Sequence, residues 1–357
     1  MEVTVVPVTV ETHPNADALE IARVGDYQSL VRKGQFLTGD LVAYIPEGSM
    51  LPLDLVEQMG LNGRLFGPDK NRVKAIRLRG TLSQGLCLAA DPAWVDGQDV
   101  MELLGITKYE SDIPTCLAGN VWFATTKRTL PYDVKNIKAS PNALEDGEIV
   151  VIKEKIHGTC FISGAVMNPD PVEGDLIVQS KGLGGKGLAM KINDPINDTN
   201  LYVRTSREYN LHEITRMERD ERGLNVYVIG EIFGHGVQDL QYGAHNGTRV
   251  EGFRVFDVFV GTPTTPDARF LNDAELTAFC ERHNLRSAPL LYRGPYSKEI
   301  MLAHTDGLET VSGTSSHMRE GVVVRPLVER YDKRLGRIQF KSVSAAYLLR
   351  KDGTEFN

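Results

Sequence analysis

The sequence predicts an α+β protein of two domains, in which a small β-barrel or sandwich precedes a larger domain of antiparallel or mixed sheets with flanking helices. A length of 357 residues is typical of two domains rather than one. The apolar pattern also changes along the chain. Short, closely spaced strands dominate before residue 105, whereas longer strands alternate with helical stretches after residue 131.

The first part is predicted to be rich in strands. Apolar and β-branched runs between turns of Gly, Pro and Asp lie at residues 3–6, 20–24, 41–45 and 73–79. Strands at this spacing are typical of a small barrel or sandwich. Residues 106–130 show no clear period and are predicted to connect the two parts, so we expect domains at 1–115 and 116–357.

The second part combines strands and helices. Its strand candidates lie at residues 148–154, 225–233, 253–260, 320–325 and 337–343. Residues 199–217 can form a helix with a modest apolar face, and Asn272-Asp273-Ala274-Glu275 has the pattern of a capping box that opens another helix. We find no internal repeat, so this alternation favours a single α+β domain.

The composition favours a soluble cytoplasmic protein. No apolar run reaches the roughly 18 residues of a membrane-spanning helix, and the N-terminus lacks the basic and apolar regions of a signal peptide. The four cysteines are widely scattered and match no zinc-binding spacing, which is typical of reduced thiols in the cytosol. We therefore expect no membrane partner.

The charge distribution leaves room for a nucleic-acid partner. A net charge of −7 argues weakly against one, because contacts to phosphates need a basic surface. One basic stretch nevertheless runs through Arg64, Lys70, Arg72, Lys74, Arg77 and Arg79. Its members Arg72, Lys74, Arg77 and Arg79 are candidate nucleic-acid contacts. A solvated surface is the alternative interpretation.

Lys155 is the candidate nucleophile. The segment Lys155-Ile-His-Gly-Thr159 directly follows a strand candidate. We expect burial and nearby cations to lower the pKa of such a lysine, which supplies the neutral amine that a nucleophile needs. Gly158 would let the backbone turn sharply and approach a ligand.

Context distinguishes this lysine from two others. Lys-x-x-Gly tetrads also begin at Lys181 and Lys333, and a surface lysine near a turn is the usual explanation for one tetrad alone. Five further segments follow the tetrad at Lys155 in a fixed order, and neither of the other two tetrads precedes all five. The series is Ser180-Lys181-Gly182, Gly230-Glu231-Ile-Phe-Gly234, Phe253-Arg-Val-Phe256-Asp257, Glu320-Gly-Val-Val-Val-Arg325 and Gln339-Phe340-Lys341.

This order and spacing resemble motifs I, Ia, III, IIIa, IV and V of the covalent nucleotidyltransferases, the superfamily of DNA ligases, RNA ligases and mRNA capping enzymes. The resemblance spans about residues 131–345 and implies an adenylyltransferase domain, an ATP-grasp-like ligase fold. In this chemistry AMP moves from ATP to a lysine and then to a 5′-phosphate, and a 3′-OH finally displaces it. Displacement at phosphorus depends on positioning and charge neutralisation, so it needs cations for the phosphates and carboxylates for a divalent metal.

The resemblance implies roles for the basic residues. Lys155 would carry AMP, Lys341 would contact the α-phosphate, Lys181 would hold ribose or phosphate, and Arg325 would face a phosphate. The residues that flank the lysine and complete the nucleotide-binding set are Glu154, His157 and Gly158.

The resemblance also implies roles for acidic and aromatic residues. Glu231 would contact the ribose or a metal-bound water, and Glu320 would assist binding of Mg²⁺ or Mn²⁺. Phe256 would stack on adenine, with Phe253 as the alternative, although a core aromatic on an alternating strand is an equal possibility for Phe256.

Two positions refine the resemblance. Many DNA ligases have Asp at the position of His157, whereas the form Lys-Ile-His-Gly-Thr is similar to RNA ligases of the nick-sealing type. Motif V usually has two lysines, but here Gln339 stands in place of the first. Arg337, which lies on the same strand face two residues away, is a candidate substitute.

The N-terminal part carries a second resemblance. His13-Pro-Asn-Ala-Asp-Ala-Leu19 is similar to a signature of tRNA-binding OB domains in synthetase-associated proteins, and Ile76–Gly80 with Ser83-Gln84-Gly85 is similar to another segment of those domains. The resemblance implies an OB-like domain that binds nucleic acid in a basic groove. A scaffolding barrel is the alternative.

Taken together, these features resemble the Deinococcus-type RNA ligases, as do residues 236–243 and 347–356. The family implies an ATP-dependent enzyme that uses Mg²⁺ or Mn²⁺ and seals a 3′-OH RNA end to a 5′-phosphate at nicks in duplexes, without an obligatory protein partner. A DNA ligase or GTP-using capping enzyme is an alternative, but His157 and the short stretch after motif V disfavour both. Gln339 favours a third possibility, a tRNA-binding protein without activity.

Overall fold

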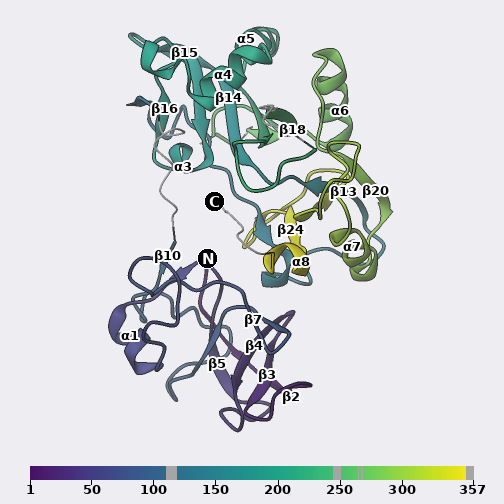
Figure 1. Cartoon of the computed structure of the whole chain (residues 1–357). Helices are drawn as coiled ribbons and strands as arrows, with labels where there is room; N and C mark the ends of the chain where they lie inside the picture. Colours follow the sequence, from purple (N-terminus) through teal and green to yellow (C-terminus); the bar gives the residue numbers. More distant parts are fainter. Residues whose placement is uncertain (110–118, 244–250, 264, 267, 351–357) are drawn as a thin grey trace. The chain divides into compact units, whose positions relative to one another are not determined.

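The computed structural model describes residues 1–109, 119–243, 251–263, 265–266 and 268–350. Their contacts divide the chain into two compact units, drawn in Figure 1. The first comprises the described residues up to 109 together with Lys138–Pro141 and Leu348–Arg350, and the second comprises the rest. The expected domain boundary at 115 and 116, and the C-terminal run from residue 351 onward, lie outside the described residues.

The first unit consists mainly of short strands. Its elements are β1 (Thr4–Pro7), β2 (Thr9–Thr12), β3 (Leu19–Val24), β4 (Tyr27–Arg32), β5 (Leu41–Ile45), β6 (Ser49–Met50), α1 (Leu53–Gln58), β7 (Ile76–Leu78), β8 (Thr81–Ser83), β9 (Leu86–Ala89) and β10 (Thr107–Lys108). They pair in the orders β1-β5-β9, β2-β3-β4, β10-β6 and β7-β8. The predicted strands at 3–6, 20–24 and 41–45 are confirmed, whereas only the end of 73–79 is a strand.

The second unit is built on two five-stranded sheets. The first has the order β12-β24-β21-β13-β20 and the second the order β15-β14-β17-β18-β19. The strands are β11 (Val121–Phe123), β12 (Lys135–Asn136), β13 (Ile149–Lys155), β14 (Thr159–Asp170), β15 (Gly174–Ser180), β16 (Leu188–Met190), β17 (Val226–Gly234), β18 (Glu251–Val260), β19 (Arg269–Phe270), β20 (Leu290–Pro295), β21 (Gly321–Pro326), β22 (Tyr331–Asp332), β23 (Gly336–Arg337) and β24 (Phe340–Val343). Pairing within both five-stranded sheets is antiparallel except between β12 and β24, as expected for a mixed α+β domain.

Helices cover these sheets. They are α3 (Lys181–Gly184), α4 (Leu201–Glu208), α5 (Leu211–Arg222), α6 (Asp273–Arg282), α7 (Lys298–Thr305) and α8 (Ala345–Leu348). Helix α5 packs on β14 and β17, and α7 packs on β21 and β24. The capping box at Asn272 is confirmed, because its side chain accepts from the Glu275 amide while Glu275 bonds back to the Asn272 amide.

One helix prediction was wrong. Residues 199–217 form two helices rather than one, because the chain breaks at Asn210. The φ angle of Asn210 is 53°, a left-handed conformation that Asn tolerates better than most residues and that cannot continue a helix. None of the helices among the described residues combines the length and apolar character needed to cross a membrane.

Candidate active site

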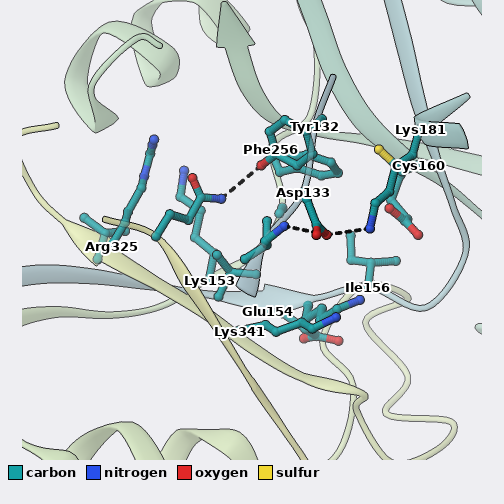
Figure 2. Close-up of a pocket in the computed structure, with 17 residues that line it drawn as sticks. Tyr132, Asp133, Lys153, Glu154, Ile156, Cys160, Lys181, Phe256, Arg325 and Lys341 are labelled. Carbon is teal, nitrogen blue, oxygen red and sulfur yellow. Dashed lines mark hydrogen bonds and ion pairs between the residues drawn. The ribbon is translucent and has the colours of Figure 1, made fainter. Parts of the chain in front are cut away.

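A single pocket in the second unit is lined from both five-stranded sheets (Figure 2). Strands β13 and β21 and residues 339–341 contribute from the first sheet, and β14, β17 and β18 contribute from the second. The predicted residues that line it are Glu154, Lys155, Lys181, Glu231, Phe256, Arg325 and Lys341. The structure therefore gathers side chains that are far apart in the sequence.

Two carboxylates surround the amine of Lys155 at the end of β13. Lys155 Nζ lies 2.7 Å from Glu320 Oε1. Burial acts to lower the pKa of Lys155, but attraction by Glu320 and Glu231 outweighs it and raises the pKa above its usual value. The lowered pKa that we expected is therefore wrong for the ligand-free protein, because the nearest charges are acidic rather than basic.

The pKa of Glu231 is also raised, but here the main cause is burial rather than a charged partner. Burial raises the pKa of the Glu231 carboxyl to about 8, against the attraction of Lys155, and repulsion by Glu320 adds to the increase. Two carboxylates that share a small site cannot both ionise easily unless a cation joins them. In the structure the Lys155 ammonium supplies that positive charge.

Three further lysines, Lys153, Lys181 and Lys341, line the same pocket. Burial, together with repulsion by Lys155 and Lys181, lowers the pKa of Lys341 to about 8. Lys181 Nζ forms an ion pair with Asp133 Oδ1 at 2.6 Å, which Figure 2 marks with a dashed line. Crowded amines of this kind repel one another until an anion binds, so the pocket is suited to phosphate groups.

The structure distinguishes the two aromatic candidates. Phe256 lines the pocket and packs beside Tyr132 with ring centroids 5.4 Å apart. Phe253 is only 2% exposed and packs against Phe161 in the core. Of the two candidates, Phe256 is therefore the one that faces this pocket.

Gly158 is required by packing behind the nucleophile. A Cβ atom at this position would overlap the carbonyl oxygen of Ile232 on β17 and approach the side chain of Glu231. The glycine thus allows the turn after Lys155 to lie against the strand that carries Glu231. This close approach is to protein backbone rather than to the ligand that we expected.

His157 is placed differently from the prediction. Its ring is 3% exposed, and both nitrogens have protein partners. Nε2 lies 2.8 Å from Asp239 Oδ1, and Nδ1 lies 2.8 Å from the hydroxyl of Tyr347. A ring bonded at both nitrogens has no free atom to offer a nucleotide, so we revise the role of His157 from nucleotide contact to positioning.

Arg325 also requires a correction. Its guanidinium is buried and pairs with Asp257 Oδ1 at 3.1 Å and with Glu329 Oε1 at 2.6 Å. These carboxylates already neutralise its charge, so Arg325 forms part of the pocket wall rather than the phosphate contact that we expected. Arg337 pairs with the same two carboxylates, each at 2.7 Å, which argues against its acting as a substitute phosphate contact.

Sequence patterns missed several lining residues. These are Tyr132, Asp133, Lys153 and Cys160. Glu154, which was predicted, has a buried oxygen, Oε1, without a hydrogen-bond partner among the described residues. Tyr132 and Asp133 follow the stretch interpreted as a connection, where no period marks them. Lys153 shows a usable signal, because it alternates with Lys155 on one strand face.

The candidate nucleic-acid contacts of the first unit divide into two groups. Arg77 and Arg79 are exposed on the β7–β8 hairpin, and Lys74 is half-buried. Arg72 is only 9% exposed, and its guanidinium lies over the ring of Tyr109, 3.4 Å from the centroid. This stacked, buried position gives Arg72 a structural role, and the prediction of nucleic-acid contact is kept for the other three.

The fold defines a class of protein in which an OB-fold domain precedes a nucleotidyltransferase domain. A family model described as an OB-fold domain matches residues 3–90. A second model, described as RNA ligase, matches residues 148–343, which is more than half of the chain and includes every segment from Lys155 to Lys341. The chain belongs to the RNA ligase family.

Solved structures of Naegleria gruberi RNA ligase share this fold. A variant with ATP and Mn has a TM-score of 0.76 at 22% identity, with 97% of each chain covered. The enzyme with PPi has a TM-score of 0.76 at 22% identity, and a variant with AMP and Mn has 0.75 at 22%, with 98% of each chain covered in both cases. A search of curated protein sequences finds no match.

Proposed function

We propose that this RNA ligase is ATP-dependent and joins an RNA 3′-OH end to a 5′-phosphate at nicks in duplexes. It acts through AMP bound to Lys155 and then through an AMP-capped 5′-phosphate. The observation that carries the proposal is the position of the Lys155 amine, which pairs with Glu320 and lies in one pocket with Glu231 and three further lysines. The Naegleria gruberi structures with ATP and Mn, with AMP and Mn, and with PPi support ATP as the donor.

The first step is a displacement at phosphorus. Lys155 Nζ, once it has lost a proton, attacks the α-phosphorus of ATP. A nitrogen–phosphorus bond forms, the bond from the α-phosphorus to the bridging oxygen breaks, and pyrophosphate leaves. Lys341 and Lys181 border the pocket, where positive charge stabilises the phosphate oxygens as they gain negative charge.

A divalent cation fits beside the nucleophile. Glu320 Oε2 is buried and has no hydrogen-bond partner among the described residues, and the Glu231 carboxyl lies close enough for mutual repulsion. Mg²⁺ and similar ions are commonly held by one or two carboxylates plus waters and substrate phosphates. We propose that Glu231 and Glu320 hold Mg²⁺ or Mn²⁺, which would neutralise charge on the phosphates.

The base and the RNA have separate candidate sites. Phe256 is proposed to stack on adenine, and Glu154, with its unpartnered oxygen, lines the same pocket. We propose that the chain divides into domains 1–115 and 116–357 and that the first binds the nicked RNA through Lys74, Arg77 and Arg79. No protein partner is required in this scheme.

The first test is formation of the covalent adduct. Protein incubated with labelled ATP and Mg²⁺ is expected to gain a label on Lys155 that is stable to alkali and labile to acid, as a nitrogen–phosphorus bond is, and Lys155→Ala should lose it. Lys333→Ala is the matched control, because Lys333 also begins a Lys-x-x-Gly tetrad but is exposed on the β22–β23 turn. A wild-type protein that forms no adduct, or a label on another lysine, would refute the assignment.

The second test concerns the substrate. Nicked duplexes with RNA or DNA on each side are compared for sealing, and a ribose at the 3′-OH end is expected to be preferred. Equal sealing of all-DNA nicks would favour the DNA ligase alternative instead. Replacing Lys74, Arg77 and Arg79 by alanine should weaken nick sealing but not adduct formation. Replacing the exposed Arg32 and Lys33 serves as the control.

A further inference from the structure

The loop that follows β17 is bonded to the turn that carries the nucleophile. Gln238 donates its side-chain amide to the carbonyl of Gly158, and the hydroxyl of Tyr242 accepts from the His157 amide at 2.6 Å. Asp239 bonds the ring of the same histidine. Three residues of one short loop therefore hold the backbone and the side chain of the turn immediately after Lys155.

The hydrogen bond to Asp239 determines which ring nitrogen of His157 carries the proton. A carboxylate can only accept, so Nε2 of His157 must donate to it across 2.8 Å. In the neutral ring Nδ1 is then an acceptor, and the hydroxyl of Tyr347 donates to it across 2.8 Å. The three side chains form one directed chain of hydrogen bonds: Tyr347 to His157 to Asp239.

This chain lies directly behind the catalytic pair. Nδ1 of His157 is 3.9 Å from Glu320 Oε2, and the other oxygen of Glu320 is the one that contacts Lys155 at 2.7 Å. Tyr347 lies on helix α8 immediately after β24, the strand that carries Lys341. The ring of His157 therefore links the turn after the nucleophile, the loop after β17 and the segment after β24.

We propose that Asp239 and Tyr347 are positioning residues for AMP transfer and that both act through His157. Asp239 sets the tautomer of the ring, Tyr347 sets its orientation, and the ring fixes the turn at 155–158 relative to Glu320. Neither residue lines the nucleotide pocket. Their effect is therefore on the placement of the Lys155 amine in the reacting complex and not on affinity for ATP.

The proposal rests on Lys155 as the nucleophile, and single-turnover kinetics test it separately. Tyr347→Phe and Asp239→Asn should each lower the rate of lysine–AMP formation at saturating ATP by roughly tenfold, while the KM for ATP changes less than about twofold. The rate of the double variant should lie within about twofold of the rate of the slower single variant, because both residues act through one ring.

Tyr227→Phe is the matched control. Its hydroxyl is also buried and donates to the Arg128 carbonyl at 2.8 Å, but it is not part of the pocket lining. This variant should lose a similar hydrogen bond without slowing AMP transfer. Thermal unfolding of all variants separates loss of fold from loss of positioning.

The possible outcomes separate the positioning role from the proposed function. Multiplied effects in the double variant, a change in KM alone, or folded single variants with the wild-type rate would overturn the positioning role while leaving the adduct on Lys155 intact. A wild-type protein without an adduct would instead overturn the proposed function. His157→Asn, which keeps an acceptor for Tyr347 but loses the donor to Asp239, should react at the rate of Asp239→Asn, and a wild-type rate would also refute the proposal.

Discussion

Asp257 is the carboxylate whose removal should most destabilise the second unit. Its side chain is fully buried. Arg337 donates to both of its oxygens, at 2.7 and 2.8 Å, and Arg325 and the hydroxyl of Tyr132 donate at 3.1 and 2.5 Å. The Gln339 amide donates a fifth hydrogen bond at 3.4 Å. Replacing Asp257 by alanine therefore removes the acceptor of five hydrogen bonds, three of them from cations.

The size of the stability loss depends on the two arginines that lose their carboxylate partner. The side chains of Arg325 and Arg337 are only 5% and 12% exposed, so both guanidiniums stay largely out of water after the substitution. Breaking a buried pair by removing one partner typically costs about 3–5 kcal/mol. Glu329 still contacts both arginines, which places the expectation near the lower end, at about 3 kcal/mol.

The dependence on pH gives the sign of this contribution. Burial would raise the pKa of Asp257, but Arg337 and Arg325 outweigh it and the pKa is lowered. A carboxyl whose folded pKa is depressed stabilises the fold above its unfolded pKa of about 3.9, and this stability disappears as pH falls through the folded value. The loss in free energy of unfolding caused by Asp257→Ala should therefore be constant between about pH 7 and 5 and become smaller only below about pH 4.

Tryptophan fluorescence can report on this unit alone. The chain has two tryptophans, and Trp122 packs in the cluster that contains Phe256, whereas Trp94 packs in a cluster of the first unit. Urea unfolding in a Trp94→Phe background therefore follows the second unit. Asp198→Ala is the control, because its pair with Arg207 is exposed and should contribute less than about 1 kcal/mol. A loss from Asp257→Ala no larger than that of the control would refute the reasoning.

Three further predictions concern the pocket. Gly158→Ala should abolish lysine–AMP formation, because its Cβ overlaps a carbonyl oxygen of β17, whereas Gly185→Ala, with open space around its Cβ, should not. ATP affinity, measured calorimetrically without metal, should fall above about pH 8 as Lys341 loses its charge and Glu231 gains one, and Lys341→Met should reduce that fall. Phe256→Leu should raise the KM for ATP by about three- to tenfold through lost stacking. Phe123→Leu, 68% exposed on β11, should not.

Patterns along single strands were predictable from the sequence. β13, β17 and β21 appear as apolar runs because both faces of each are largely buried. The ordered series of short segments also correctly predicted that Lys155, Lys181 and Lys341 share one pocket. Strands β14 and β15 were missed, although they belong to the same sheet as β17 and β18. Their glycines and polar residues dilute the apolar pattern, and they are stabilised by pairing, β14 with β15 and β17 and β15 with β14.

Roles that depend on tertiary partners were not predictable. Arg325 looks like a phosphate contact until Asp257 and Glu329 are placed beside it, and His157 looks like a nucleotide contact until Asp239 and Tyr347 are found at its two nitrogens. A sequence pattern specifies which residue types occur in a motif. It does not specify which of them already have a partner of opposite charge, and that determines whether a side chain is available to a ligand.

The same principle explains the departure at Gln339. Its amide donates to the hydroxyl of Tyr132 at 3.0 Å, which in turn donates to Asp257. The buried ionic residues of this wall are balanced, with three cations and three carboxylates: Lys153, Arg325, Arg337, Asp257, Asp273 and Glu329. A lysine at position 339 would add a buried charge without a matching carboxylate, at a cost that a neutral amide avoids. Gln339 is therefore the residue that this network accommodates, and the positive charge that faces the pocket is left to Lys341 and Lys181.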